Sequence, residues 1–169
     1  MKEYSFHTGK EYQLDKKDKK ILLALLENGR YTVAQIAKKT GLRRDSIIYR
    51  IKKLEENKII LDFQPLISAP ALGFPNVAQL LLKTKISNKE DKDFFIKKLK
   101  QEPTIVHISI TIGRFDIYLA IIYKEHTELY KTIEQIKSIK PDYILDYEIL
   151  QVVDDPKFED MEGLIKSLS

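Results

Sequence analysis

The sequence contains no cysteine, only three histidines and no long apolar run. The lack of cysteine excludes disulfides, thiol nucleophiles and thiolate metal sites. His7, His107 and His126 are scattered and show no HExxH-type spacing, so we expect no metal site and no cofactor. No apolar stretch approaches the ~20 residues that span a bilayer, and the first residues have no hydrophobic segment followed by a small-residue cleavage site. We therefore expect neither a membrane segment nor a secretory signal.

The charged residues that are present are unevenly placed. The 169 residues are 43% apolar and 32% charged, which is typical of a soluble globular protein with one medium domain or two small ones. The formal net charge is +4, but residues 14–62 alone carry 13 Lys or Arg against 7 Asp or Glu, and residues 63–169 carry a net charge of −2. This asymmetry indicates a module for nucleic acid or another anionic surface. The alternative is a basic face that only solubilises a helical domain.

The first third of the chain has the pattern of three helices. Asp15 can N-cap a helix from Lys16 to about Asn28, and the Thr32-Val33-Ala34-Gln35 run has capping-box spacing for a second helix that ends near Gly41. A third helix is expected over 43–57, with an apolar side made by Ile47, Ile51 and Leu54. A tight glycine turn between the last two helices is typical of a helix-turn-helix. We assign this domain to residues 14–62, with the β-rich segment 59–64 as a short wing.

A linker and a second domain follow. Residues 63–76 contain three prolines and a glycine, which breaks any regular pattern, although Leu66, Ile67, Leu72 and Phe74 would have to pack on something. From Val77 the apolar period becomes two, and strands and helices are expected in the order β-α-β-β-α-β over residues 77–153. This order is that of a ferredoxin-like α+β domain. The strands are expected at 77–86, 105–112, 117–123 and 144–153, and the helices at 88–100 and 127–139.

The expected sheet has too much apolar character for a face in water. In the strand 105–112, the side expected to face the helices carries Val106, Ile108, Ile110 and Ile112. The opposite side of the sheet still offers Tyr118, Ala120 and Ile122. A sheet with helices on one side only should be polar on its other side, so a second copy of the chain is expected to cover it. The alternative is ordinary scattered surface apolarity. Residues 154–169 are expected to form an amphipathic helix that docks on its own domain or on a neighbour.

Two sequence signatures in this order resemble the Lrp/AsnC (feast/famine) transcription regulators. The first spans residues 14–60; its matching residues are Leu14-Asp15, Asp18, Ile21-Leu22, Gly29-Arg30, Ile36-Ala37, Gly41-Leu42, Ile47, Arg50-Ile51, Leu54-Glu55 and Ile60. The second is the Gly113-x-Phe115-Asp116 turn between two strands. The resemblance implies a cytoplasmic DNA-binding regulator that binds double-stranded DNA as a homodimer, or as a larger assembly such as an octamer. Two residues depart from the family pattern: Arg43 replaces the serine that caps the third helix, and Lys58 replaces a glycine before the wing.

The third helix is the expected reading helix. With its apolar side turned inward, its first turn would enter the major groove, and Arg44 is the best candidate for bidentate contact with guanine. Tyr49 is expected at a phosphate or a thymine methyl, Thr32 and Lys53 at phosphates, and Asp45 at a cytosine or a neighbouring arginine. Arg50 has two open alternatives, an intramolecular salt bridge or a phosphate contact. The predicted DNA-binding residues are Thr32, Arg43, Arg44, Asp45, Ser46, Tyr49, Arg50 and Lys53.

The resemblance also implies an effector site, and rival functions have to be weighed beside it. Gly113, Phe115 and Asp116 would bind a small effector such as an amino acid, with Asp116 holding its ammonium group; the alternative is that these residues only build the hairpin turn. An enzyme such as a haem-biosynthesis decarboxylase shares this architecture, but it would need clustered His, Tyr and Arg side chains, and His107 stands alone. An oligomerisation adaptor without DNA function conflicts with the charge asymmetry. We expect a regulator and not an enzyme.

Overall fold

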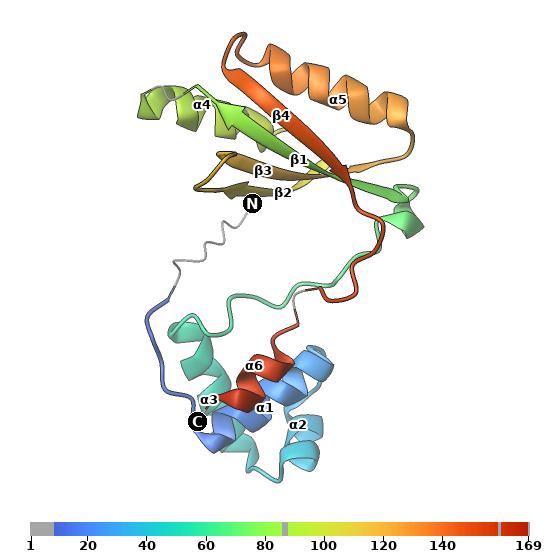
Figure 1. Ribbon diagram of the computed structural model, residues 1–169. Helices are drawn as coiled ribbons and strands as arrows, with labels where there is room; N and C mark the ends of the chain where they lie inside the picture. The colour runs from blue at the N-terminus through green and yellow to red at the C-terminus, as the bar shows by residue number, and fades with distance from the viewer. Residues whose placement is uncertain (1–8, 86–87, 159, 169) are drawn as a thin grey trace. The chain divides into compact units, whose positions relative to one another are not determined.

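A computed structural model describes residues 9–85, 88–158 and 160–168 (Figure 1). The chain forms two compact units. Unit 1 joins the residues up to Leu66 with those from Lys157 onward, and unit 2 spans Ile67–Pro156. Unit 2 is therefore inserted between two parts of unit 1. In the described ranges no helix has the length and apolar character needed to cross a bilayer.

Unit 1 is built on three helices whose ends match the local capping chemistry. Helix α1 (Lys16–Glu27) is N-capped by Asp15, which accepts from the backbone N–H groups of Lys17 and Asp18 in a full capping box. Helix α2 (Val33–Thr40) has a capping box between Thr32 and Gln35 and ends at Gly41, whose φ of 73° is readily adopted by glycine. Helix α3 (Arg44–Glu56) follows directly. The predicted helix-turn-helix is confirmed.

Two apolar clusters hold unit 1 together. The first joins α1, α2 and α3 through Ile21, Ala24, Ile36 and Ile47, all 4% exposed or less. The second contains Leu22 of α1, Leu54 of α3 and Ile165 of helix α6 (Glu162–Ser167). The last helix of the chain therefore closes the core that the first three helices begin.

Two expectations for unit 1 are wrong. The predicted wing is absent, since residues 59–64 form no strand; the N–H groups of Ile59 and Ile60 instead both donate to the Leu54 carbonyl at the end of α3. The C-terminal helix is also much shorter than residues 154–169, because it covers only Glu162–Ser167 and buries only Ile165. The other apolar residues of the predicted helix, Phe158, Met161, Leu164 and Leu168, are 43–60% exposed. Lys58 tolerates the positive φ (60°) that the family's glycine would adopt.

Unit 2 is a four-stranded antiparallel sheet with strand order β2-β3-β1-β4. The strands are β1 (Asn76–Thr84), β2 (Ile105–Ile110), β3 (Ile117–Tyr123) and β4 (Ile144–Gln151), and the helices are α4 (Lys89–Leu99) and α5 (His126–Ser138). A short 3₁₀ turn, Pro70–Leu72, precedes β1. The predicted βαββαβ order and the α+β fold class are confirmed. Ile86, the predicted end of the first strand, lies outside the described residues.

The core of unit 2 lies between the helices and one face of the sheet (Figure 1). The register aligns Ile108, Leu119, Leu80 and Ile149 across the four strands, and these side chains pack in the core. The prediction for β2 is partly wrong: Val106, Ile110 and Ile112 are 57%, 49% and 106% exposed. A register irregularity between Ile105 and His107 shifts the alternation, so that Ile105 packs in the core in place of Val106.

The opposite face of the sheet, which we call the open face, is covered by neither of the two helices of unit 2. Its central row consists of His107, Ala120, Gln79 and Leu150, and the next row of Ser109, Tyr118, Leu81 and Glu148. The expectation that the linker residues must pack is wrong for Leu66, Ile67 and Leu72, which are at least 64% exposed. Phe74 alone is half-buried, with the Lys124 ammonium 5.0 Å from its ring centroid.

Candidate nucleic-acid interface

Helix α3 presents one polar side to its surroundings. Its inward side chains, Ile47 and Leu54, are fully buried. The outward side carries Arg44, Asp45, Ile48, Tyr49 and Lys52, all exposed, with Tyr49 at 66%. This side can therefore approach a duplex without rearrangement of the core. Ser46 is half-buried at the edge of this side.

The first turn of α3 concentrates positive charge. Arg43 is the N-cap residue and makes no side-chain capping bond, as its lack of an acceptor requires. In the described parts of the chain neither Arg43 nor Arg44 has a hydrogen-bond or ion-pair partner, so both guanidinium groups are available to a ligand. Asp45 lies in the same turn, where the positive end of the helix dipole stabilises a carboxylate.

The hydroxyl of Thr32 already has a structural role. It accepts from the Gln35 backbone N–H (3.3 Å) and donates to the Gln35 side-chain oxygen (2.9 Å). The Thr32 backbone N–H donates to the same oxygen (2.8 Å). A phosphate at the start of α2 would share this capping box, so contact of Thr32 with DNA stays a prediction.

Arg50 points toward α1. Its Nη1 donates to Asp15 Oδ2 and to Asp18 Oδ1, both at 2.6 Å, and the Asp18 side chain is only 3% exposed. Burial alone would raise the pKa of Asp15, but hydrogen bonds from the Asp18 backbone, the Arg50 guanidinium and the Lys17 backbone outweigh it and hold that pKa below its ordinary value. Of the two alternatives for Arg50, the structure provides the intramolecular salt bridge.

Lys53 has an aromatic neighbour that sequence reasoning missed. Its ammonium lies 5.3 Å from the ring centroid of Tyr12, and the hydrogen bond with the Tyr12 hydroxyl raises the pKa of Lys53. Tyr12 itself packs against the cluster of Leu22, Leu54 and Ile165. Nothing in the sequence signals this, because Tyr12 precedes the first helix by several residues. Lys53 is exposed and remains within reach of a phosphate.

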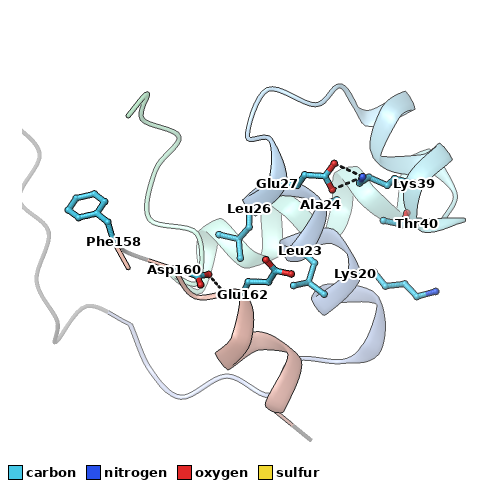
Figure 2. Close-up of a pocket in the computed structure, with 10 residues that line it drawn as sticks. All are labelled: Lys20, Leu23, Ala24, Leu26, Glu27, Lys39, Thr40, Phe158, Asp160 and Glu162. Carbon is cyan, nitrogen blue, oxygen red and sulfur yellow. Dashed lines mark hydrogen bonds and ion pairs between the residues drawn. The ribbon is translucent and has the colours of Figure 1, made fainter. Parts of the chain in front are cut away.

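A groove of about 740 Å³ lies in unit 1 beside α1 (Figure 2). It is lined by Leu23 and Leu26 of α1, by Lys39 of α2, and by residues of the C-terminal segment including Phe158. Its charged groups are already largely paired: Glu27 binds Lys39, Asp160 lies 3.7 Å from Lys157, and Glu162 binds Lys166. Lys39 is therefore occupied by a neighbouring carboxylate.

The turn Gly113–Asp116 connects β2 to β3 and is anchored through Asp116. The Asp116 carboxylate accepts from Lys83 Nζ (3.0 Å), the Thr84 backbone N–H (2.8 Å) and the Thr84 hydroxyl (3.2 Å). Burial would raise the pKa of Asp116, but these bonds outweigh it and lower that pKa. Gly113 has a φ of 152°, which side chains rarely adopt, and open space beside it. Arg114 stacks on Phe115 with its guanidinium carbon 4.9 Å from the ring centroid.

The open face of unit 2 is semi-apolar, as the sequence indicated. Leu81, Tyr118 and Ile122 are half-buried and Leu150 is 43% exposed. The His107 ring contacts the Tyr118 ring edge-on at 5.7 Å and shares a hydrogen bond of 2.7 Å with Ser109. Burial, followed by the charge of Asp155, raises the pKa of Tyr118. Among the described residues, no group of acidic or histidine side chains is placed to hold a metal ion.

These features define a helix-turn-helix protein with an appended ferredoxin-like domain. The sequence model of the AsnC-type helix-turn-helix domain matches residues 14–55. The transcriptional regulator FL11 of Pyrococcus furiosus is 33% identical over 127 residues, which cover 75% of this chain and 82% of FL11. The regulator Ptr1 of Methanocaldococcus jannaschii is 35% identical to this chain, and the aligned residues cover 70% of this chain and 78% of Ptr1. A regulator of Neisseria meningitidis, solved with L-Met, has the same fold, with a TM-score of 0.78 at 21% identity over 90% of this chain and 99% of that one.

The chain belongs to the Lrp/AsnC family of transcription regulators. Its relatives are named as regulators of transcription, so the decarboxylase alternative is set aside and the protein is not an enzyme. The helix-turn-helix implies that it binds DNA.

Proposed function

We propose that the protein reads a two-part DNA site as a homodimer, with the first turn of α3 in the major groove. The observation that carries this proposal is a pair of arginines, Arg43 and Arg44, that have no partner among the described residues and lie at the exposed start of a helix whose inward residues Ile47 and Leu54 are buried. Arg44 contacts a guanine edge, whereas Arg43 and Lys53 contact phosphates. Asp45, Ser46 and Tyr49 complete the reading side, and Thr32 borders it at the start of α2.

The proposed dimer forms through the open face of the sheet. Leu81, Tyr118 and Ile122 lie there without a helix to cover them, whereas the other face is packed. Two copies related by a two-fold axis would present two α3 helices to half-sites about one DNA turn apart. Such a regulator acts where the DNA is, which we take to be the cytoplasm.

A small effector is proposed to act at the turn Gly113–Asp116. The structural likeness to a regulator that was solved with L-Met supports an amino acid as the ligand class. In this chain Asp116 is held by Lys83 and Thr84, so an ammonium group would have to compete with Lys83. We therefore assign Asp116 the role of fixing the turn, and Phe115 and the backbone at Gly113 that of contacting the ligand.

The DNA-reading proposal is tested by substitution at Arg44. The wild-type protein is first used to select its preferred duplexes from random DNA. Arg44→Ala should bind these duplexes with relaxed specificity at one base step, where the discrimination in favour of the preferred base falls by about 1–3 kcal/mol. Lys53→Ala should weaken binding to all duplexes alike. Lys20→Ala, an exposed α1 lysine away from the reading side, is the control. An unchanged base preference in Arg44→Ala would refute its assigned role.

A further inference from the structure

Helix α3 exposes two large apolar side chains that the fold of unit 1 does not use. Within residues 27–60, all of which the structure describes, the exposed large apolar side chains are Ile48 and Tyr49, at 56% and 66%. Neither belongs to the two apolar clusters of unit 1, whereas Ile47 and Ile51 of the same helix both pack in the first cluster. The described chain therefore provides no cover for Ile48.

The outward side of α3 consists of two rows of side chains, because residues four positions apart on a helix are neighbours. The first row contains Arg44, Ile48 and Lys52, and the second contains Asp45, Tyr49 and Lys53. Ile48 thus shares its row with the arginine assigned to a guanine edge. Tyr49 shares its row with the lysine assigned to a phosphate.

The major groove offers one apolar group among the four bases, the C5 methyl of thymine. The other groups on the base edges are ring nitrogens, carbonyl oxygens and amino groups that form hydrogen bonds. The side chain of Ile48 can neither donate nor accept a hydrogen bond, so its contact with such a group would leave that group without a partner. Contact with a methyl group instead removes apolar surface from water on both sides. An isoleucine among base edges therefore favours thymine.

The alternative is that Ile48 is one of the single apolar residues that any protein surface contains. Its surroundings argue against this. Apart from Tyr49, the other exposed positions of α3 all carry a charged residue: Arg44, Asp45, Lys52, Lys53, Glu55 and Glu56. Isoleucine is also a weaker helix former than lysine, arginine or glutamate. The departure from the charged pattern thus occurs in the middle of the row that begins with Arg44.

We propose that Ile48 reads a thymine through contact with its C5 methyl group, beside the guanine that Arg44 reads. This assignment rests on the proposed function, which places α3 in the major groove. Tyr49, in the neighbouring row, then contacts a phosphate. Ile48 lies about 6 Å from Arg44 along the helix axis, and neighbouring base pairs are about 3.4 Å apart. The thymine therefore lies within about two base pairs of that guanine.

The test removes one methyl group at a time from the DNA. Duplexes selected from random DNA by the full-length wild-type protein are remade with deoxyuridine in place of each thymidine in turn, which keeps every hydrogen-bonding group of the base. At one thymine of a half-site this change should weaken wild-type binding about fourfold, as expected for the loss of one buried methyl contact. In Ile48→Ala the same change should lose most of its effect. Fluorescence anisotropy measures both affinities.

Two further variants separate Ile48 from its neighbour. Tyr49→Phe is the matched control, because it removes the hydroxyl assigned to a phosphate and leaves Ile48 in place. It should weaken binding to all duplexes alike and keep the full effect of deoxyuridine. Ile48→Val, which is shorter by one carbon, should keep part of that effect. Circular dichroism verifies that each variant folds.

The proposal is overturned if no thymine responds to deoxyuridine, or if the response is unchanged in Ile48→Ala. It is also overturned if the responding thymine lies well beyond two base pairs from the guanine identified with Arg44→Ala. Failure of the proposed function is distinguishable from these results. An unchanged base preference in Arg44→Ala, with the deoxyuridine effect still dependent on Ile48, would refute the role of Arg44 alone. A wild-type protein that selects no preferred sequence would overturn both.

Discussion

Arg50 shows how one side chain on a reading helix can serve the fold. It lies on α3 among residues that we propose to face DNA, yet its guanidinium bridges Asp15, the N-cap residue of α1, and Asp18 of α1. The buried Asp18 carboxylate needs this partner because an unpaired charge in an apolar interior is costly. The ion pairs therefore tie α3 to the start of α1.

Arg50→Ala should destabilise unit 1 by about 3 kcal/mol, because it leaves Asp18 buried without its cation. Segment-resolved hydrogen exchange of α1 and α3 measures the change. Lys52→Ala, an exposed α3 substitution, should change stability by less than about 0.5 kcal/mol. If Arg50 instead contacted a phosphate, its removal would lower the salt slope of DNA binding by about one unit with little loss of stability.

The carboxylate of Asp116, which anchors the turn Gly113–Asp116, should make the stability of unit 2 depend on pH in the acid range. Its folded pKa lies below the ordinary value of 3.8, so the unfolded chain binds the proton more readily. The stabilisation is therefore present above about pH 4 and is lost as the pH falls through the lowered folded pKa. Asp116→Asn should lower the stability of unit 2 by about 2 kcal/mol near neutral pH and flatten its acid dependence. Hydrogen exchange of β1 and β3 across this range is the measurement, and an unchanged slope would count against the anchor.

At the scale of elements, helix α6 depends on its docking site. Six residues are too few for a stable isolated helix in water, and α6 has no side-chain N-cap. Two contacts hold α6 in place. Ile165 is only 9% exposed and packs with Leu22 and Leu54, and the Lys19 ammonium donates to the Leu168 carbonyl. The chain thus returns from unit 2 to complete the core of unit 1.

Ile165→Ala should destabilise unit 1 by about 2 kcal/mol through loss of buried apolar contacts. The neighbouring Leu164→Ala is the matched control, since that side chain is 56% exposed and its removal should cost little. Chemical denaturation followed by hydrogen exchange in α1 and α3 separates unit 1 from unit 2. Equal effects of the two substitutions would mean that α6 does not pack as described.

Local chemistry made the helices and strands predictable, and long-range contacts account for most of what was missed. Asp15, Thr32 and Gly41 mark helix ends through bonds within a few residues, so the sequence alone indicates them. The wing failed because a β-rich segment needs a partner strand, and Ile59 and Ile60 turn back on Leu54 instead. The irregularity at β2, the Tyr12–Lys53 contact and the docking of Ile165 join residues distant in sequence or register, and no periodicity reports them.

The candidate site was predictable to the same extent. The exposed side of α3 follows from the 3.6-residue period once Ile47 and Leu54 are placed inside, so Arg44 and Tyr49 could be assigned without coordinates. The partners of Thr32, Arg50 and Asp116 could not be chosen from the pattern alone. Each of these side chains has a hydrogen-bond partner within the fold. The sequence does not show whether such a side chain binds that partner or an external ligand, because the partner is brought close only when the chain folds.

At the scale of the whole molecule, the proposed pairing of two chains has a consequence for DNA geometry. Two α3 helices held by one two-fold axis can enter successive major grooves only on the same side of the duplex. Affinity should therefore be highest for half-sites about 10.5 bp apart and fall sharply when about 5 bp are inserted, which rotates one half-site to the far side. The affinity for DNA should also fall steeply between low and moderate salt as counterions are released.

Leu81→Lys, which places a charge on the open face, should abolish the spacing preference but keep weak, salt-dependent binding. Fluorescence anisotropy on the two duplexes measures this, with Tyr130→Lys as control; equal binding of both spacings by the wild-type protein would show that the reading helices are not held as a pair.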